Sequence, residues 1–582
     1  MRGFSITAAA CGALAALFFA SCRSVPEAAE SADGPLVGRP KSVVKRVEKW
    51  YTKARFGMFY HWGMFTGGDG ASHSKSKKPP RFQTVEEFEK AAPSPEVLAK
   101  NLVALTKKVG AKYLILTIEH SCGQHMVIFP TKVPEFLCKT KKDYFGAVLR
   151  EAHANGIKVV GYFTARPHHY KSFGKIYIAG IEGDPNSKES IAKFSEILTR
   201  FFADMKERYG EDSIDGFWMD GFSSWEPVIK SFPNAVRIGN NHLTFKSMPP
   251  PSDICAKEFT SGPCDPAYCR PSGMVKPLLR WGDDHLAPRK DYMEDIPHCG
   301  GWWYHGYPIV NQFTKDKTFV VKQMVCSLGV RRKWNYALGI GPTLDGTVPK
   351  SLEPVVDTLA AFMKWAGPAI YDTTGGEDAP LRGGWLNSGA YGVVTVSLRE
   401  KNTYYLIVTE PPTKYTKNYL RVQHDWVRVK SITDLRTGKP VEFDMKGSLN
   451  IHNGDWSDIK NYGAKIFKII LQGRNEKMIG KEEKFFYKDK TKDFIRYEVS
   501  GDGDIPLVLI HGFASSCRNW DDIVRRLEKD GNCPYTIYAI DCKGTGGSSK
   551  PEKSDYSIPG HAKIIAEFIR KKKLDKHVMV GH

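Results

Sequence analysis

Between about residue 45 and residue 370, short apolar runs alternate with stretches that have one apolar face. The runs that predict strands are Phe56–His61, Tyr113–Glu119, Lys158–Thr164, Gly216–Asp220 and Val236–Asn240. The stretches that predict amphipathic helices include Pro95–Val109, Tyr144–Asn155 and Ser190–Tyr209. This alternation is typical of βα units around a parallel sheet. Because no glycine-rich dinucleotide fingerprint follows the first strand, the pattern favours a closed (β/α)8 TIM-like barrel over an open sheet.

The pattern changes beyond Thr373, where the helical period disappears. Short alternating runs follow, at Gly392–Leu398, Thr403–Val408, Trp426–Lys430 and Ala464–Leu471. They predict a small β-sandwich after the barrel. Residues 473–493 are rich in Lys and Glu, which is typical of a linker, and a separate α/β unit follows. The predicted units are a catalytic barrel, a β-sandwich, a linker and a partial α/β-hydrolase unit, over 43–373, 374–472, 473–493 and 494–582.

The N-terminus has the layout of a secretory signal. Arg2 precedes an apolar run that ends in Ser21 and Cys22, and this run is too short for a confident membrane span. Phe19-Ala20-Ser21-Cys22 resembles a bacterial lipobox, in which the cysteine is lipidated after cleavage. Residues 1–22 therefore predict a lipoprotein signal and 23–42 a flexible tether. We expect an exported protein, anchored at the bacterial cell envelope through Cys22; an ordinary cleaved signal with an incidental cysteine is the alternative.

The net charge of +20 changes this picture little. Lys and Arg are spread along the whole chain without a recognised nucleic-acid motif, which predicts a solvated basic surface and no nucleic-acid partner. The cysteines lie mostly singly, and Cys255, Cys264, Cys269 and Cys299 lack the C-x2-C spacing of zinc sites. We therefore expect no metal, although an oxidising compartment would allow a disulfide among these cysteines.

Polar residues follow several of the predicted strands, where a barrel places its active site. They include His61-Trp62, Glu119-His120, His168-His169 and Asp220-Gly221. Asp220 follows Phe217-Trp218-Met219, so its carboxylate is expected beside an aromatic wall. A carboxylate there can attack an anomeric carbon while a second acid, about 5 Å away, protonates the leaving oxygen. The structural alternative is an Asp that caps the next helix.

Four segments, in order, resemble glycoside hydrolase family 29, the α-L-fucosidases, over about residues 45–472. Arg55–Gly63 is similar to the K-F-G-I-F-x-H-W-G first strand, and Phe217–Gly221 to the L-W-F-D-G nucleophile strand. Asn335–Gly346 is similar to G-N-L-L-L-N-I-G-P-x-x-D-G, and Ala369–Thr373 to A-I-Y-G-T. The resemblance implies hydrolysis of terminal α-L-fucosyl residues from glycans, with retention, through a covalent intermediate on Asp220. It also implies that no metal or organic cofactor takes part.

The acid/base of the family varies in position, and two glutamates here resemble it. Met293-Glu294, followed by Trp302-Trp303-Tyr304, is similar to the family's W-E and its aromatic stretch, which makes Glu294 the first choice. Ala256-Lys257-Glu258-Phe259 is similar to the upstream T-P-E segment and makes Glu258 the second. Either glutamate could instead be a salt-bridge carboxylate at the barrel rim.

The second strand departs from the family pattern. Where the family reads T-K-H-H-D-G-F, this chain reads Thr117 to Gly123 as T-I-E-H-S-C-G, so only the second histidine is kept. In the family both histidines bind sugar hydroxyls, so Glu119 replaces a switchable donor by an acceptor and predicts altered sugar recognition. The predicted substrate-binding residues are His61, Trp62, Glu119, His120, Trp218, Trp302 and Trp303. The aromatic residues among them could instead belong to the core.

The last segment resembles the N-terminal part of α/β-hydrolases. Pro506–Ala514 is similar to their opening strand and oxyanion loop, Ala539–Ser549 to D-x-x-G-x-G-x-S, and Val578–His582 to the strand before the G-x-S-x-G elbow. No elbow serine follows in this sequence, so we expect that the segment assembles no catalytic triad. A parent protein that fuses a glycosidase with an esterase is one hypothesis for this arrangement.

The sequence as a whole supports two readings of function. The first is a retaining exo-glycosidase that resembles α-L-fucosidases and acts on fucosylated or related glycans at the cell envelope. The alternative is a surface glycan-binding protein on the same barrel with little or no catalysis, which Glu119 motivates. An acyl hydrolase is disfavoured because the nucleophilic serine is missing from this sequence.

Overall fold

The fold is described from a computed structural model of the chain. The residues that it describes are 41–67, 81–120, 126–164, 171–172, 175–181, 184–185, 187–220, 225–240, 252–259, 293–297, 309, 312–330, 334–376, 379–413, 419–424, 427–445, 448–472, 481–487, 493–512, 515–528 and 533–582. The predicted lipidation site Cys22 lies outside these residues, and so does the tether. Among the helices described, none is long and apolar enough to cross a membrane.

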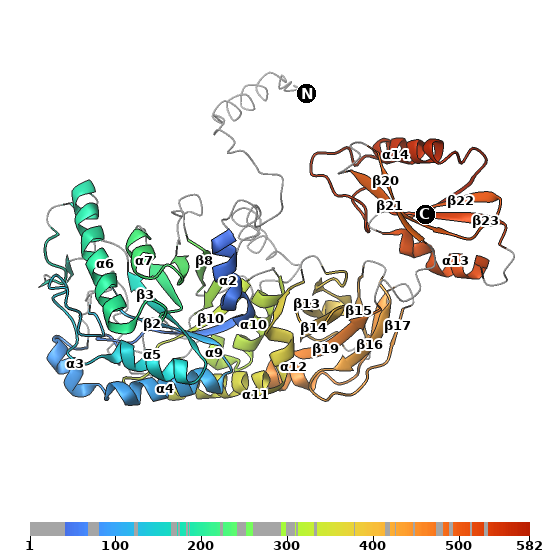
Figure 1. Ribbon diagram of the computed structural model, residues 1–582. Helices are drawn as coiled ribbons and strands as arrows, with labels where there is room; N and C mark the ends of the chain where they lie inside the picture. Colours follow the sequence, from blue (N-terminus) through green and yellow to red (C-terminus); the bar gives the residue numbers. More distant parts are fainter. Residues whose placement is uncertain are drawn as a thin grey trace, which may run out of the picture.

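Eight parallel strands close into a barrel in the order β1-β10-β9-β8-β7-β6-β3-β2 (Figure 1). They are β1 (Phe56–Tyr60), β2 (Tyr113–Thr117), β3 (Lys158–Thr164), β6 (Gly216–Asp220), β7 (Val236–Asn240), β8 (Ile254–Phe259), β9 (Met293–Pro297) and β10 (Trp334–Ile340). The predicted TIM-like barrel is confirmed. The five strands expected from the apolar runs are all present, and three of them have the predicted bounds.

Helices cover the outside of the ring (Figure 1). They are α3 (Val85–Ala91), α4 (Pro95–Lys108), α5 (Tyr144–Ala154), α6 (Lys188–Tyr209), α7 (Glu226–Ser231), α9 (Gln312–Lys315), α10 (Phe319–Val330) and α11 (Glu353–Ile370). Several begin at the side-chain caps that their sequences favour. Ser94, Asp143 and Ser187 each accept a hydrogen bond from a backbone N–H of the first turn of α4, α5 and α6.

Side chains alternate between the two faces of each barrel strand. In β2, Leu114 and Leu116 join the core between strands and helices, whereas Tyr113 and Ile115 join a separate cluster inside the ring. Helix α2 (Lys41–Ala54) adds Val47 and Tyr51 to this inner cluster and so closes the N-terminal end of the barrel. The inside is packed, so chemistry is confined to the C-terminal ends of the strands.

Two antiparallel sheets follow the barrel, which confirms that this region is β-rich; the sandwich itself stays a prediction. One sheet has the order β11-β13-β14-β19-β16, with β12 beside β13, and the other has the order β15-β18-β17. The bounds are β11 (Thr373–Gly375), β12 (Gly384–Trp385), β13 (Tyr391–Ser397), β14 (Thr403–Glu410), β15 (Tyr419–Val422), β16 (Val429–Asp434), β17 (Phe443–Asp444), β18 (Leu449–His452), α12 (Ser457–Tyr462) and β19 (Lys465–Leu471). The strand expected at Trp426–Lys430 lies later, at Val429–Asp434, where it pairs with β19.

The C-terminal unit is a five-stranded sheet in the order β20-β21-β23-β22-β24. Its elements are β20 (Lys481–Phe486), β21 (Phe494–Ser500), β22 (Ile505–Ile510), α13 (Asp521–Glu528), β23 (Tyr535–Ile540), α14 (Ile558–Lys571) and β24 (Val578–Gly581). Strand β20 lies within residues 473–493, so the linker prediction is wrong for this part. Its Lys and Glu residues resemble a linker because β20 is an edge strand, with Phe485 buried and most of its charged side chains at least partly exposed.

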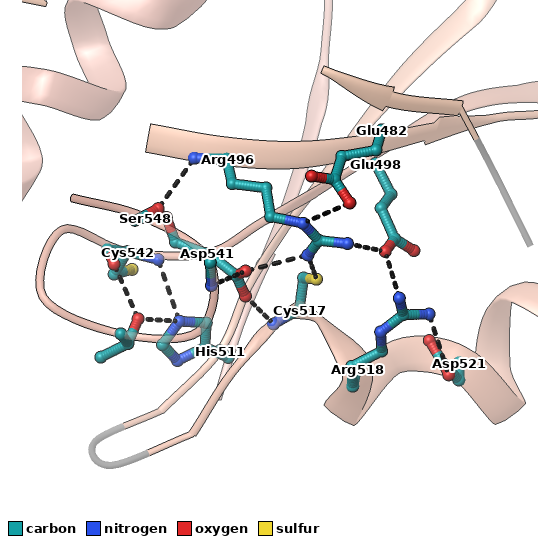
Figure 2. A network of polar contacts seen from close by, with 12 residues as sticks. Glu482, Arg496, Glu498, His511, Cys517, Arg518, Asp521, Asp541, Cys542 and Ser548 are labelled. Atoms are coloured by element: carbon teal, nitrogen blue, oxygen red, sulfur yellow. Dashed lines mark hydrogen bonds and ion pairs between the residues drawn. The ribbon is translucent and has the colours of Figure 1, made fainter. Parts of the chain in front are cut away.

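A buried ion network holds the C-terminal unit together (Figure 2). The Arg496 guanidinium contacts Asp541 at 2.9 Å and also Glu498, and Asp541 accepts the backbone N–H groups of Cys517 and Gly547. Burial by itself would raise the pKa of Asp541, but these donors and the guanidinium lower it below its usual value. The network therefore ties β21 to the end of β23 and to the segment at Cys517, in addition to the sheet pairing.

At the closed end of the barrel, Asp215 joins the starts of neighbouring strands. Its carboxylate contacts His153 Nε2 at 2.9 Å, Lys158 Nζ at 2.8 Å and the backbone N–H of Val159 at 2.9 Å. Burial would raise the pKa of Asp215, but these three partners lower it below its usual value. A carboxyl group with a lowered pKa in the folded state stabilises that state at neutral pH, and this stabilisation is lost as the pH falls through the lowered value.

We expect Asp215→Asn to reduce the free energy of unfolding by about 1–3 kcal/mol at pH 7. The difference from wild type should be smaller at pH 3, because this pH lies below the usual pKa of an Asp carboxyl group, about 3.9, and the unfolded state then binds a proton that the folded state binds only at lower pH. Urea unfolding followed by tryptophan fluorescence at both pH values measures this. Asp357→Asn is the control, because Asp357 is exposed and pairs with Lys108 at the surface. Equal losses in the two variants would contradict the role of Asp215.

Candidate active site

Asp220 is the last residue of β6 and lies at the C-terminal mouth of the barrel. It shares a strand face with Trp218, which belongs to the inner cluster, and its side chain is partly exposed. Helix α7 begins at Glu226, and its N-cap residue is Trp225, without a side-chain cap. Asp220 is therefore not a helix cap, and its carboxylate is placed to face a ligand at the mouth.

Tyr162 of β3 holds the Asp220 carboxylate. Its hydroxyl donates a hydrogen bond of 2.7 Å to Asp220 Oδ2. The phenol ring lies between two others: it stacks on His120 with ring centroids 5.1 Å apart and on Trp218 at the same separation. Aromatic contacts on both faces restrict the ring, so the hydroxyl is fixed where it meets the carboxylate.

Sequence reasoning missed Tyr162, although a signal for it was present. Tyr162 lies two residues after Val160 in β3, and both belong to the inner cluster. Alternation along the strand therefore placed its hydroxyl on the inner face near the mouth. The partner was not readable, because the contact joins residues that are 58 positions apart.

The histidines predicted to bind sugar lie beside this aromatic group. His61 is fully buried, and its ring centroid is 4.5 Å from that of Phe59, 5.3 Å from that of His120 and 5.5 Å from that of Tyr162. The structure thus brings His61, His120, Trp218 and Asp220 together around Tyr162.

Glu119 is buried at the same mouth. Its Oε2 accepts a hydrogen bond of 3.1 Å from the backbone N–H of Thr164, the last residue of β3. Glu119 and His120 also line a small cavity together with Thr117, Met64 and Met126. The residue that departs from the family pattern therefore lines a cavity at the barrel mouth.

The two predicted tryptophans that the structure describes point to different places. Trp218 is fully buried inside the ring under Asp220, and its indole N–H has no hydrogen-bond partner among the described residues. Trp62 follows the inward-facing His61 and so turns to the outer core, where its ring lies 5.0 Å from that of Phe88. Its indole N–H donates to the Leu344 carbonyl oxygen. The indole of Trp62 is therefore part of the core, the alternative given for the aromatic residues, although Trp62 also borders the cavity beside Glu119.

The strand registers place the two candidate acids at different heights of the barrel. The row of register partners that starts at Asp220, the last residue of β6, leads through β7 to Ala256 in β8. From Ala256 it leads to Glu294 and then to Asn335, which are the second residues of β9 and β10. This line therefore descends from the mouth toward the closed end, as tilted barrel strands require.

A contact with α2 shows that this row of register partners ends near the closed end of the barrel. Asn335 donates a hydrogen bond to the backbone oxygen of Tyr51 in α2, the helix that closes the barrel. Glu294 is its register neighbour and so has its backbone in the lower half. Glu258 lies two residues after Ala256, near the C-terminal end of β8, and its backbone is at the level of the mouth.

The side-chain positions of several predicted site residues are not described. The side chains of Glu258 and Glu294 are not described, and Trp302, Trp303, His168 and His169 lie outside the described residues. Within the described part of the chain, no group of three His, Cys, Asp or Glu side chains could hold a metal ion.

A family model with the description alpha-L-fucosidase matches residues 27–368, and a model of the α/β-hydrolase fold matches residues 505–582. The first match covers more than half of the chain. The chain belongs to the α-L-fucosidase family. A relative of this family member is the tissue alpha-L-fucosidase of Bos taurus, 22% identical over 348 residues, which are 55% of this chain and 68% of that protein.

Solved structures of α-L-fucosidases share the fold. Isoenzyme 1 from Paenibacillus thiaminolyticus has a TM-score of 0.55 and 18% identity, over 74% of this chain and 100% of that one. A Bacteroides thetaiotaomicron α-L-fucosidase, solved as a trapped covalent intermediate with 2-fluoro-fucosyl fluoride, has a TM-score of 0.55 and 17% identity, over 77% of this chain and 100% of that one. At these identities the likeness establishes the architecture of this α-L-fucosidase family member and not its specificity.

Tyr162→Phe tests the contact with Asp220. The variant keeps the ring between His120 and Trp218 and removes only the hydroxyl that donates to the carboxylate. We expect kcat/KM for an aryl α-L-fucoside to fall by about 10- to 100-fold, since hydrogen bonds to charged groups contribute about 1.5–3 kcal/mol. Thermal unfolding should change little.

Tyr144→Phe is a matched control, because Tyr144 is fully buried in the outer core and packs against Trp62. Its kcat/KM should remain close to wild type. A Tyr162→Phe enzyme with unchanged kcat/KM would show that the hydrogen bond to Asp220 has no catalytic effect.

Proposed function

We propose that this chain is a retaining exo-glycosidase that removes terminal α-L-fucosyl or closely related residues from glycans, with Asp220 as nucleophile. One observation carries the proposal: a carboxylate at the barrel mouth is held by the Tyr162 hydroxyl at 2.7 Å, above a buried aromatic layer. Family membership supports the reaction class, since the related proteins carry the name α-L-fucosidase.

Catalysis would proceed in two displacements. The Asp220 carboxylate attacks the anomeric carbon, the bond to the leaving oxygen breaks, and a second carboxylic acid protonates that oxygen. The same acid, now a carboxylate, removes a proton from water, which attacks the anomeric carbon and releases Asp220. Each step inverts the anomeric centre, so the product retains the configuration of the substrate.

Tyr162 would serve as a positioning residue for the nucleophile. Its hydrogen bond orients the carboxylate at the mouth, and the stacked His120 and Trp218 rings prevent the phenol from swinging away. Orientation of this kind reduces the entropic cost of reaching the reactive geometry. The trapped covalent intermediate of the Bacteroides thetaiotaomicron relative is consistent with the same reaction course here.

We favour Glu258 over Glu294 as the acid/base, which reverses the order expected from the motifs. The backbone of Glu258 lies near the C-terminal end of β8, as that of Asp220 does at the end of β6. A retaining glycosidase needs its two carboxyl groups about 5–5.5 Å apart. The lower position of Glu294, beside Asn335, makes this separation harder to reach.

We propose further that the enzyme works at the cell envelope, anchored through a lipid on Cys22. The lipobox-like Phe19-Ala20-Ser21-Cys22 supports this. Helix α2 leads the chain onto the closed end of the barrel, opposite the mouth. A tether attached at that end would leave the mouth accessible to glycans.

Asp220→Ala is expected to lower kcat for an aryl α-L-fucoside by several orders of magnitude, because it removes the group that forms the covalent bond. Substrate binding, measured by calorimetry, should largely remain. Asp345→Ala is the control, since Asp345 is a loop residue that bonds to Thr343 and Thr347. Unchanged turnover in Asp220→Ala would refute the assignment.

Labelling with a 2-fluoro-α-L-fucosyl fluoride identifies the nucleophile directly. A peptide that contains Asp220 should carry the sugar, as mass spectrometry after proteolysis would show. Oligosaccharide binding without labelling or turnover would instead support the glycan-binding alternative, which the buried Glu119 favours.

The acid/base assignment is tested with two leaving groups. Glu258→Gln should lower kcat/KM by about 100-fold or more for a fucoside with a poor alcohol leaving group, since general acid catalysis contributes about 10²- to 10⁴-fold. For a dinitrophenyl leaving group, which needs no proton, the loss in the first step should be small. Glu294→Gln provides the comparison, and a larger leaving-group dependence in that variant would restore Glu294 as the acid/base.

A further inference from the structure

The solvent-facing side of helix α2 is basic. Lys45, Lys49 and Lys53 are exposed and follow one another at intervals of four residues, so they form one row along the helix. Glu48 is the one exposed acidic side chain among the described residues of α2. The row therefore presents three positive charges to solvent at the closed end of the barrel.

Two sets of contacts fix the direction of this row. Val47 and Tyr51, on the opposite side of α2, belong to the cluster inside the barrel. Arg46 donates two hydrogen bonds to the Asp253 carboxylate, at 2.8 and 2.7 Å, and Asp253 directly precedes β8. Because α2 cannot rotate about its axis without breaking these contacts, the three lysines stay on its outer side.

The turn between β13 and β14 lies beside the end of α2. The backbone N–H of Asp372 donates to the Lys53 carbonyl oxygen at 3.3 Å, and the N–H of Leu398 donates to the Asp372 carbonyl oxygen at 2.8 Å. Leu398 is 59% exposed. The next residue, Arg399, pairs with the Asp372 carboxylate and is itself exposed. An apolar side chain and a further cation therefore lie at the end of the lysine row.

Lys112 adds another cation at the same end. It is exposed directly before β2, and its ammonium group lies 4.6 Å from the centroid of the Tyr371 ring, one residue before Asp372. These exposed cations and the exposed leucine are called the closed-end surface below. Its residues are Lys45, Lys49, Lys53, Lys112, Leu398 and Arg399.

We propose that the closed-end surface docks on an anionic phospholipid membrane. Lysines near such a membrane are attracted by its negative surface potential. Binding of a basic surface to a bilayer also grows with the apolar area that enters the boundary between headgroups and acyl chains, and Leu398 supplies such area. A nucleic acid would match the charge but would leave Leu398 without an apolar layer to enter, so the exposed leucine favours a membrane.

This docking goes beyond catalysis, and it rests on the envelope location proposed above. The predicted tether leads into α2, so a lipid on Cys22 would hold the closed-end surface close to the bilayer. Asp220 lies at the opposite end of the barrel. Docking would therefore turn the mouth away from the membrane, toward glycans in the surroundings.

Vesicle binding tests the proposal on the full chain with Cys22→Ser, which cannot be lipidated. Cosedimentation is measured with vesicles that hold equal parts of phosphatidylglycerol and phosphatidylcholine, and with vesicles of phosphatidylcholine alone. The partition coefficient should be higher on the anionic vesicles and should fall as salt is added, since salt screens exposed charges. Adding Lys45→Gln, Lys49→Gln and Lys53→Gln together should lower it by about 100-fold, because each lysine near an anionic membrane strengthens binding about fivefold.

Leu398→Gln tests the apolar part of the contact in the same background. It should lower the partition coefficient on the anionic vesicles by about threefold or more, because the leucine side chain no longer leaves water. If the three lysine substitutions weaken binding and Leu398→Gln does not, the partner is a polyanion without an apolar layer, and the membrane proposal is overturned.

A matched control removes the same charge elsewhere. Lys90→Gln, Lys188→Gln and Lys193→Gln together replace exposed lysines of α3 and α6. This variant should bind the anionic vesicles as well as the Cys22→Ser chain does. Equal losses in the two triple variants would show that only net charge matters, and equal binding to both kinds of vesicle would show that anionic headgroups are not recognised. Either result overturns the proposal.

Turnover separates this inference from the proposed function. The variants of the closed-end surface should keep the kcat/KM of wild type for an aryl α-L-fucoside, since the substitutions lie at the opposite end of the barrel from Asp220. Turnover without preference for anionic vesicles overturns the docking and leaves the function standing. Docking as expected in a chain that turns over no fucoside refutes the function and leaves the docking standing.

Discussion

A closed ring of strands gives every barrel residue one of two surroundings, and the rest of this structure depends on that constraint. Alternate side chains face the helices or the interior, and both places are packed with apolar groups. Below the mouth, the described interior is filled by the side chains of the inner cluster. Polar side chains such as Asp220 and Glu119 lie at the C-terminal strand ends, the level at which barrels of this kind carry their active sites.

Aromatic packing then converts a strand end into a positioned nucleophile. Trp218 and His120 contact the two faces of Tyr162, and the phenol hydroxyl in turn binds the Asp220 carboxylate. The same rings that fill the barrel thus orient the reactive group. Because the inner cluster continues down to α2, the support for this arrangement extends to the closed end of the barrel.

The C-terminal unit shows a different way to fix a sheet. Arg496 and Asp541 lie at its centre, and both are almost completely buried. Removal of one partner from such a pair leaves an uncompensated buried charge, which costs about 3–5 kcal/mol. The network in Figure 2 is therefore a structural centre of this unit, separate from the carboxylates at the barrel mouth.

Sequence alone determined the local elements and part of the site. Strands β3, β6 and β7 have their predicted bounds, since a buried parallel strand is a short continuous apolar run between breakers. The position of Asp220 after such a run indicated the mouth. The alternation of side chains along the first strand also indicates that Trp62, one residue after His61, faces outward, although the motif alone suggested sugar binding.

Only the tertiary structure decided which distant residues meet. The hydrogen bond from Tyr162 to Asp220 and the pairing of β20 with β21 depend on register between separate segments, which no local pattern encodes. The relative heights of Glu258 and Glu294 likewise follow from the tilt of the strands in a closed ring. Side-chain periodicity acts over a few residues, whereas ring closure and tilt are properties of all eight strands together.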